Sequence, residues 1–142
     1  MGLALEQARL AEVDNEVPVG AVLILEGQLI ASGRNASIST CDPSAHAEIN
    51  VLRAAGKQLQ NYRMPGAVIY VTLEPCPMCA GAMVHARIQR LVYAASDPRT
   101  GAAGSVFDLA CDAKLNHQLE ITSGVMAQKS ADMLKTFFQK RR

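Results

Sequence analysis

Two short motifs in the chain contain residue types that bind metals and move protons. His46 and Glu48 are separated by one residue in the segment HAEIN, and Cys76 and Cys79 are separated by two residues in EPCPMC. Thiolate and imidazole groups are common Zn²⁺ ligands, and three protein ligands with one open position are typical of a catalytic zinc site. The motifs together predict that His46, Cys76 and Cys79 bind one Zn²⁺ ion per subunit, with Glu48 beside it.

The spacing within each motif constrains how these side chains can meet. Cys76 and Cys79 lie where a predicted strand passes into a predicted helix, and residues three apart share one helical face. A helix N-terminus also favours the thiolate form of cysteine. Residues two apart, such as His46 and Glu48, point to nearly opposite sides inside a helix. We therefore expect the N-terminal end of their helix to face the metal, so that the site lies on the helix axis.

A closed structural zinc site is the main alternative for the same residues. Cys41 lies five residues before His46, and with Cys76 and Cys79 it would complete a Cys₃His site. That arrangement leaves Glu48 beside the metal without a role. The cysteine pair alone is also compatible with two buried thiols, since free cysteine is often buried.

Composition bounds the class of protein and its surroundings. The chain has 142 residues, of which 49% are hydrophobic, and a net charge of +1. These values predict a single globular domain over residues 1–142, with no overall charge that favours nucleic acid. No apolar run approaches the roughly 18 residues needed to span a bilayer. We therefore expect a cytoplasmic protein with no membrane association, in which cysteines serve as ligands or buried thiols rather than disulfides.

Hydrophobic periodicity and turn residues predict the elements that position the motifs. We expect helices at 3–13, 77–87 and 127–140, a helix from Asp42-Pro43 to Gly56, and strands at 17–25, 28–35, 67–73, 90–95 and 118–122. The two first strands form a hairpin with its turn at Glu26-Gly27. The implied order, β-β-α-β-α-β-α-β-α, indicates a three-layer α/β/α sandwich. Its sheet is five-stranded and mixed, with the N-terminal hairpin as the antiparallel edge and the active site at the carboxyl ends of the parallel strands.

A zinc ion beside an unligated carboxylate favours one class of reaction. Zinc lowers the pKa of its bound water toward 7, and Glu48 is placed to take the proton and deliver it elsewhere. The expected chemistry is hydrolytic attack on an electrophilic carbon. Metalloproteases use similar groups in an H-E-x-x-H helix, which this chain lacks. The pattern His46-x-Glu48 followed by Pro75-Cys76-x-x-Cys79 instead matches the zinc nucleobase deaminases.

From about residue 16 onward the chain closely resembles the bacterial tRNA-specific adenosine deaminases. The resemblance rests on EVPVGAVL, DPSAHAEI, NYR, YVTLEPCPMCAGAM, HARI, DPRTGAAGS, LNHQLEIT and the FF near the C-terminus. It implies a cytidine deaminase-like fold and a homodimer that acts on a tRNA anticodon stem-loop. The implied reaction converts the wobble adenosine to inosine through attack of zinc-activated hydroxide on C6, with Glu48 as the proton shuttle.

The resemblance also implies roles for residues outside the two motifs. Asn35 matches an asparagine that contacts the flipped nucleoside, and Asp97 matches an acidic loop residue near the RNA backbone. Phe138 belongs to the C-terminal segment FFQKRR, which matches the helix that lies against the anticodon loop. Aromatic side chains stack on bases and basic side chains hold phosphates, so this composition suits RNA. We expect at least one residue of the phenylalanine pair to be part of the core instead.

Two other functions are compatible with the zinc motif. A deaminase of free nucleobases or nucleosides, such as cytosine, cytidine or guanine, needs the same metal and carboxylate. A non-catalytic RNA-binding module with a structural zinc would use the cysteines and histidine but not Glu48. Ammonia release from an anticodon stem-loop distinguishes the first alternative, and substitution of Glu48 distinguishes the second.

Overall fold

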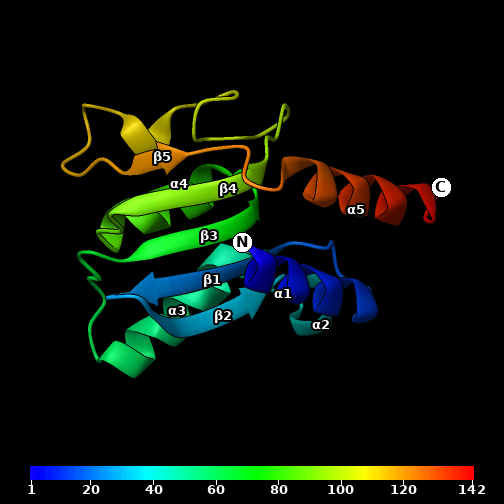
Figure 1. Ribbon diagram of the computed structural model, residues 1–142, viewed down its shortest axis with the longest axis horizontal. Coiled ribbons are helices and arrows are strands. Elements are labelled where there is room, and N and C mark those ends of the chain that lie inside the picture. Colours follow the sequence, from blue (N-terminus) through cyan, green and yellow to red (C-terminus); the bar gives the residue numbers. More distant parts are fainter.

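A five-stranded mixed sheet lies at the centre of the computed structural model, which describes residues 1–142 (Figure 1). Its strands are β1 (Gly20–Leu25), β2 (Gln28–Arg34), β3 (Val68–Leu73), β4 (Arg90–Ala95) and β5 (Glu120–Thr122), in the spatial order β2-β1-β3-β4-β5. Strand β1 is antiparallel to both neighbours, while β3, β4 and β5 are parallel. Strands β2, β3 and β4 therefore end at the same edge of the sheet. The predicted mixed sheet with an N-terminal antiparallel hairpin is confirmed. Its antiparallel strand is β1, which lies second in the sheet, and the edge strand is β2.

The hairpin turn follows from the two residues predicted for it. Glu26 and Gly27 both have positive φ, 51° and 76°. Positive φ at both central residues is the requirement of a two-residue type I′ turn, whose twist matches that of the flanking strands. A register shift after Leu23, which pairs with Ala31 while Ile24 pairs with Leu29, bends the ribbon.

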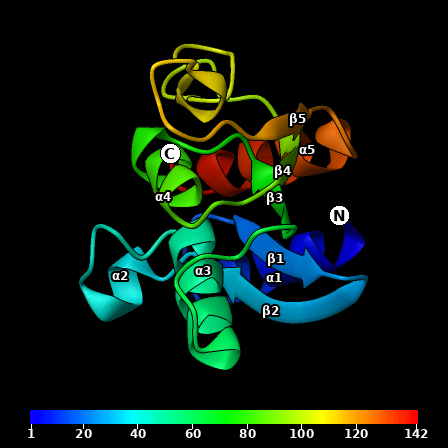
Figure 2. The same cartoon turned by 90° about the vertical axis from the view of Figure 1, so that its left-hand side faces the viewer.

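Helices cover both faces of the sheet and form the two outer layers of the sandwich. They are α1 (Gly2–Val13), α2 (Ser37–Thr40), α3 (Ala47–Leu59), α4 (Pro77–His85) and α5 (Ala127–Gln139). Figure 2 shows α3 and α4 on one face and α1 and α5 on the other, in agreement with the contacts of each helix. The predicted three-layer α/β/α arrangement is therefore confirmed.

Small residues allow the helices to approach the sheet closely. The predicted stripe of α1, Ala4, Ala8 and Ala11, is fully buried. On the other face, a Cβ atom at Gly33 of β2 would lie 2.8 Å from the backbone nitrogen of Val51 in α3. A methyl group does not fit at that distance, so glycine at this position allows α3 to pack this closely against the sheet.

The structure differs from the predicted elements in four respects. The helix expected from Asp42 begins at Ala47, because the Asp42 carboxylate accepts hydrogen bonds from the Ser44 backbone N–H and hydroxyl and forms a turn instead. The same helix continues past Gly56 to Leu59. Between β4 and β5 there is no α-helix, only the short 3₁₀ turn η1 (Leu109–Cys111). The short helix α2 was not predicted.

Candidate metal centre and adjoining groove

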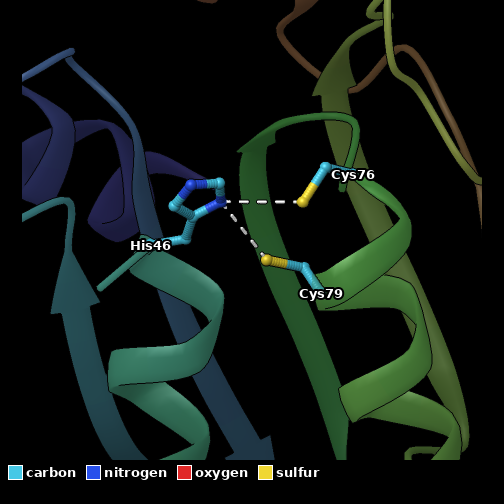
Figure 3. Close-up of side chains that lie close together, drawn as sticks. All are labelled: His46, Cys76 and Cys79. Atoms are coloured by element: carbon cyan, nitrogen blue, oxygen red, sulfur yellow. Dashed lines mark hydrogen bonds between the residues drawn. The ribbon is translucent and has the colours of Figure 1, made fainter. Parts of the chain in front are cut away.

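His46 and Cys76 begin the two helices that cover the same face of the sheet. Each occupies the N-cap position of its helix, His46 of α3 and Cys76 of α4, and each has extended backbone angles. The side chain of an N-cap residue leaves the end of the helix rather than its side. Figure 3 shows the N-terminal ends of the two helices side by side, with the His46 ring pointing toward Cys76 and toward Cys79, which lies one turn into α4. The three side chains therefore meet at the N-terminal ends of the two helices. The position of the metal on the axis of α3 stays a prediction.

The spacing of the three donor atoms suits a tetrahedral metal ion. His46 Nδ1 lies 3.6 Å from Cys76 Sγ and 3.5 Å from Cys79 Sγ, and all three atoms lie within 4.8 Å of one another. Zinc–sulfur and zinc–nitrogen bonds of about 2.3 and 2.1 Å at a tetrahedral angle place a sulfur about 3.6 Å from a nitrogen. The donor set and its two nitrogen–sulfur distances therefore fit Zn²⁺.

The closeness of the three donors shifts their protonation. The neighbouring Cys79 and His46 side chains outweigh burial and lower the pKa of Cys76 to about 4. The neighbouring Cys76 and the buried surroundings raise the pKa of Cys79. The hydrogen bond with Cys76 raises the pKa of His46. The cluster thus holds negative charge at the N-terminus of α4, where the helix dipole favours it.

Glu48 is a buried carboxyl beside these donors. It lies in the first turn of α3, with 4% of its surface exposed. Burial raises the pKa of Glu48 to about 7, because a charged carboxylate is poorly solvated there. Glu48 is not one of the three clustered donors. A carboxyl that is half ionised near neutral pH can both accept and donate a proton.

Cys41 is not part of the cluster. Its side chain is exposed, and its thiol donates to the carbonyl oxygen of Ile38 in α2. The clustered donors are His46, Cys76 and Cys79 alone. The closed Cys₃His alternative therefore has no support in the structure.

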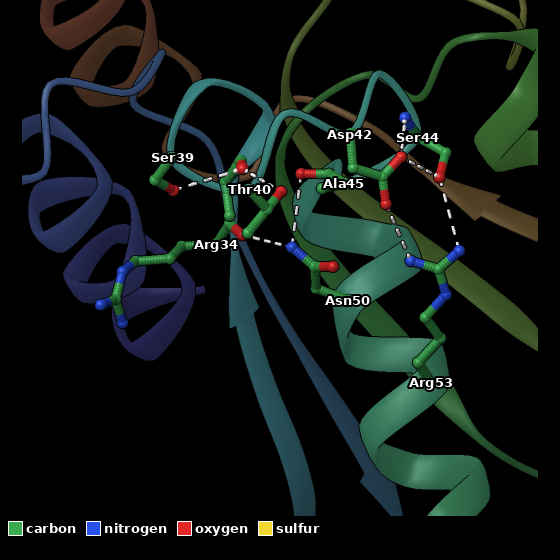
Figure 4. A network of polar contacts seen from close by, with 9 residues as sticks. Arg34, Ser39, Thr40, Asp42, Ser44, Ala45, Asn50 and Arg53 are labelled. Carbon is green, nitrogen blue, oxygen red and sulfur yellow. Dashed lines mark hydrogen bonds and ion pairs between the residues drawn. The ribbon is translucent and has the colours of Figure 1, made fainter.

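The loop that leads to His46 is held by side chains of α3 (Figure 4). Asn50 donates from its Nδ2 atom to the carbonyl oxygens of Arg34 and Ala45, at 2.8 and 3.3 Å. Arg53 forms an ion pair with Asp42 at 3.5 Å. Because one helix binds both ends of the loop, the backbone at His46 has a defined position relative to the end of β2.

Asn35 follows β2 and caps α3. Its Oδ1 atom accepts a hydrogen bond of 2.8 Å from the backbone N–H of Ala47, the first residue of the helix. This contact fixes the side chain next to His46 and leaves the Nδ2 donor free of protein partners. The structure thus places a predicted substrate-binding residue beside the metal-binding donors.

Asp97 and Phe138 line one groove of about 500 Å³, at the edge where β3 and β4 end. The Asp97 carboxylate accepts hydrogen bonds from the Arg99 and Thr100 backbone N–H groups and from the Thr100 hydroxyl, so it also closes a turn. Phe138 is 48% exposed, whereas Phe137 is 2% exposed and packs in the core. The prediction that one of the two phenylalanines is a core residue is confirmed.

Basic side chains surround the same groove. Arg99, Arg141 and Arg142 are among its lining residues. Arg141 donates to the Asn15 carbonyl oxygen at 3.1 Å, and its guanidinium lies over the Phe137 ring. These contacts attach the C-terminus of α5 to the end of α1 and hold positive charge beside Phe138.

Glu16 is a buried carboxylate to which the sequence alone assigned no role. Its two oxygens accept hydrogen bonds from the backbone N–H groups of Ile38 (3.2 Å) and Ser39 (2.7 Å), which begin α2. The N–H groups at the start of a helix have no partner within the helix, so Glu16 satisfies two of them. The contact spans more than 20 residues of sequence, so no local motif indicates it.

No helix in the structure has the length and apolarity required to cross a bilayer.

Comparison with known proteins shows that the chain is similar to deaminases. Residues 1–142 match the family described as MafB19-like deaminase. The chain is 55% identical to the tRNA-specific adenosine deaminase of Haemophilus influenzae, over 100% of the chain and 83% of that protein. It is 43% identical to that of Bacillus subtilis, over 98% and 86% respectively. A solved structure from a study of A-to-I editing by tRNA:A34 deaminases at the wobble position superposes with a TM-score of 0.91 at 46% identity, covering 94% of this chain and 97% of the other.

Proposed function

The chain belongs to the tRNA-specific adenosine deaminase family, and from this premise we infer that it converts adenosine to inosine at the wobble position of a tRNA anticodon. The observation that carries the conclusion is the convergence of His46, Cys76 and Cys79 at two helix ends. The buried carboxyl of Glu48 in the first turn of α3 adds the group that the hydrolysis requires.

We propose that His46 Nδ1 and the sulfur atoms of Cys76 and Cys79 hold one Zn²⁺ ion per subunit. The match between their spacings and a tetrahedral N/S site supports this assignment. Zinc bound there supplies Lewis acidity, which makes water a competent nucleophile near neutral pH. The low pKa of Cys76 favours the ionised form that metal binding requires.

Glu48 moves the protons of the reaction. Hydrolytic deamination adds the oxygen of water to C6, breaks the bond between C6 and the exocyclic nitrogen, and releases ammonia. The carboxylate of Glu48 accepts a proton from the attacking water and delivers it to ring nitrogen N1. It then accepts the second proton, from the hydroxyl group formed at C6, and delivers it to the departing amine. A pKa of about 7 matches both directions of transfer at neutral pH.

Asn35 positions the base that has left the stack. Its Oδ1 atom is held by Ala47, so the free Nδ2 donor has a defined direction beside His46. An unpaired nucleotide of an anticodon loop is extruded at a cost of only a few kcal/mol. Asn35 then binds the extruded nucleoside and orients its C6 atom toward the metal-binding donors.

The groove between the end of β4 and helix α5 receives the flanking RNA. Phe138 offers an exposed ring on which a base can stack, and Arg99 and Arg142 offer charge for phosphates. Asp97 organises the turn that carries Arg99 and lies near the RNA backbone. The net charge of the chain is only +1, so this local distribution provides the attraction.

We also propose that the protein is a homodimer that pairs through α3 and α4. These helices border a groove of about 780 Å³, whose apolar lining includes Ile49, Leu52, Ala82 and Ala86, with Tyr62, 70% exposed, at its rim. A second copy would cover these side chains. Light scattering should give twice the chain mass, and Ala82→Glu, which places a charge in the groove, should give a monomer. A monomeric wild-type protein would contradict the proposal.

Mass spectrometry of tRNA nucleosides tests the proposed reaction. Incubation of tRNA with the zinc-loaded protein should produce inosine at the wobble position, and metal analysis should give one zinc per chain. Free cytidine and guanine serve as comparison substrates for ammonia release. Release from either of these, with none from an anticodon stem-loop, would show that the protein is a deaminase of free bases or nucleosides instead.

A further inference from the structure

Glu74 is a buried carboxylate that takes no part in the chemistry described above. It follows β3 directly, two residues before Cys76, and is 2% exposed. Its Oε2 atom accepts the backbone N–H of Asp97 at 3.0 Å and the hydroxyl of Ser105. Its Oε1 atom accepts the backbone N–H groups of Ala103 and Ser105, both at 3.0 Å. One side chain therefore satisfies four donors of a single loop.

The loop bound by Glu74 closes tightly around the carboxylate. Gly101 lies against it, and a Cβ atom at this position would overlap the carboxylate and lie 2.5 Å from the carbonyl oxygen of Asp97. The backbone N–H of Ala102 donates to the carbonyl oxygen of Pro75 at 2.8 Å. The loop from Asp97 to Ser105 is thus attached to the two residues that immediately precede Cys76.

The same loop forms one wall of the groove that contains Phe138. Asp97, Pro98 and Arg99 line that groove, and each belongs to the segment that Glu74 holds. Cys76 itself is placed by the start of α4 and by its contacts with His46 and Cys79. Glu74 therefore precedes Cys76 by two residues in the chain, while its side-chain hydrogen bonds all go to the loop that forms the groove wall.

We propose that Glu74 is a positioning residue for the RNA substrate: it holds the loop from Asp97 to Ser105 in the conformation that binds the anticodon. This inference rests on the proposed function, because it assigns Glu74 to the binding of the same substrate. Four donors converge on two oxygens, and each oxygen accepts two hydrogen bonds. Only a group with two acceptor oxygens satisfies them, which explains why glutamate rather than glutamine occupies the position.

Steady-state kinetics of Glu74→Gln with an anticodon stem-loop test the proposal. The amide nitrogen of glutamine faces donors instead of accepting from them, so the loop loses its position. We expect KM to rise about tenfold or more, as expected when hydrogen bonds to a charged group are lost. The value of kcat should change by less than about threefold, since the metal-binding donors stay in place. Zinc content should remain one per chain.

Glu120→Gln is the matched control. Glu120 is an exposed carboxylate on β5, paired with Arg90 at 2.7 Å and outside both the metal centre and the groove. This variant should have the kinetic constants of the wild-type protein. Wild-type protein that fails to deaminate the stem-loop would refute the proposed function, whereas an active wild type with an unchanged KM in Glu74→Gln would refute only the role of Glu74.

Two further variants keep the carboxylate and disturb the loop. Ser105→Ala removes one of the four donors, and Gly101→Ala pushes the loop away from the carboxylate. Both should raise KM while they retain zinc, with the larger effect at Gly101. A purely structural role for Glu74 would lower the melting temperature in all three variants and leave KM unchanged. Loss of zinc together with kcat in Glu74→Gln would also overturn the proposal, because Glu74 would then support the metal centre.

Discussion

Asn35 Oδ1 accepts the backbone N–H of Ala47 at 2.8 Å, which connects the end of β2 to the first residue of the helix that carries Glu48. The oxygen of this side chain caps a helix, and its nitrogen, which has no partner in the protein, is the donor that we propose for the nucleoside.

Two substitutions at Asn35 distinguish its capping contact with α3 from its proposed contact with the nucleoside. Asn35→Asp retains the capping oxygen but replaces the Nδ2 donor, so we expect wild-type stability with kcat/KM for the stem-loop lowered about tenfold or more. Asn35→Ala removes both groups and should also lower the free energy of unfolding by about 1 kcal/mol. Denaturant unfolding and steady-state kinetics measure the two effects. Full activity in Asn35→Asp would contradict a role in substrate binding.

Glu48→Gln should abolish turnover without loss of zinc. The amide cannot accept the proton of the attacking water, and the loss of a general acid–base group typically lowers kcat about 10²- to 10⁴-fold. Stability should be equal or higher, because a buried ionisable carboxyl is replaced by a neutral group. Inosine formation, zinc content and melting temperature are the measurements. Undiminished turnover would support the alternative of a non-catalytic RNA-binding module.

Cys41→Ser and Cys76→Ser should have opposite effects on zinc. Cys41 is exposed and lies outside the cluster, so its substitution should leave zinc content, stability and activity unchanged. Cys76→Ser removes a thiolate donor and should lose zinc and activity together. Metal analysis after dialysis against a chelator provides the comparison. A Cys41→Ser protein that loses zinc would favour the closed structural site.

Phe137 and Phe138 offer a matched pair of substitutions on one helix. Phe137→Ala opens a cavity at a residue that is 2% exposed and should cost about 3–5 kcal/mol of stability. Phe138→Ala, at a residue that is 48% exposed, should leave stability nearly unchanged. It should weaken stem-loop binding about 5- to 150-fold, as expected for one stacked base. Unchanged affinity in Phe138→Ala would remove this residue from the RNA-binding site.

Because of Glu16, the free energy of unfolding should depend on pH in the acidic range. Burial alone would raise the pKa of Glu16, but hydrogen bonds from the Ser39 and Ile38 backbone N–H groups outweigh it, so the pKa lies below its ordinary value of 4.5. A group whose pKa is lowered by folding contributes stability above the unfolded-state pKa, and the contribution is lost as pH falls through the folded-state pKa. Glu16→Gln should therefore be less stable than wild type at pH 7, and the difference should shrink as the pH falls through the folded-state pKa of Glu16.

Thermal unfolding across this pH range measures the effect. Glu6→Gln, a substitution on the exposed side of α1, serves as the control and should follow the wild-type curve. A constant difference between Glu16→Gln and wild type at every pH would show that the loss comes from packing and not from the charge.

Local sequence signals were sufficient for the sheet and for most helices. The hairpin follows from two strand-like segments around the turn at Glu26-Gly27, and β3 and β4 follow from continuous apolar runs. Of the metal-binding donors, the cysteine pair follows from its spacing at a strand-to-helix junction. These features depend on residues close together in the chain, which is why a single sequence predicts them.

The start of α3 was mispredicted because its cap comes from elsewhere in the chain. Asp42-Pro43 has the composition of a helix start, yet Asp42 bonds to Ser44 in a turn. The true N-cap, His46, makes no capping hydrogen bond with its side chain, and Asn35 supplies that bond from 12 residues earlier. Glu16 and Glu74 likewise contact segments more than 20 residues away. Only the folded chain reveals such pairings.

The donors His46, Cys76 and Cys79 belong to helix ends packed on the sheet, while Asp97 and Phe138 belong to a turn and to a peripheral helix. Descendants of such a chain can therefore exchange or lengthen the peripheral parts and acquire a new substrate preference, while they inherit the same reactive centre unaltered.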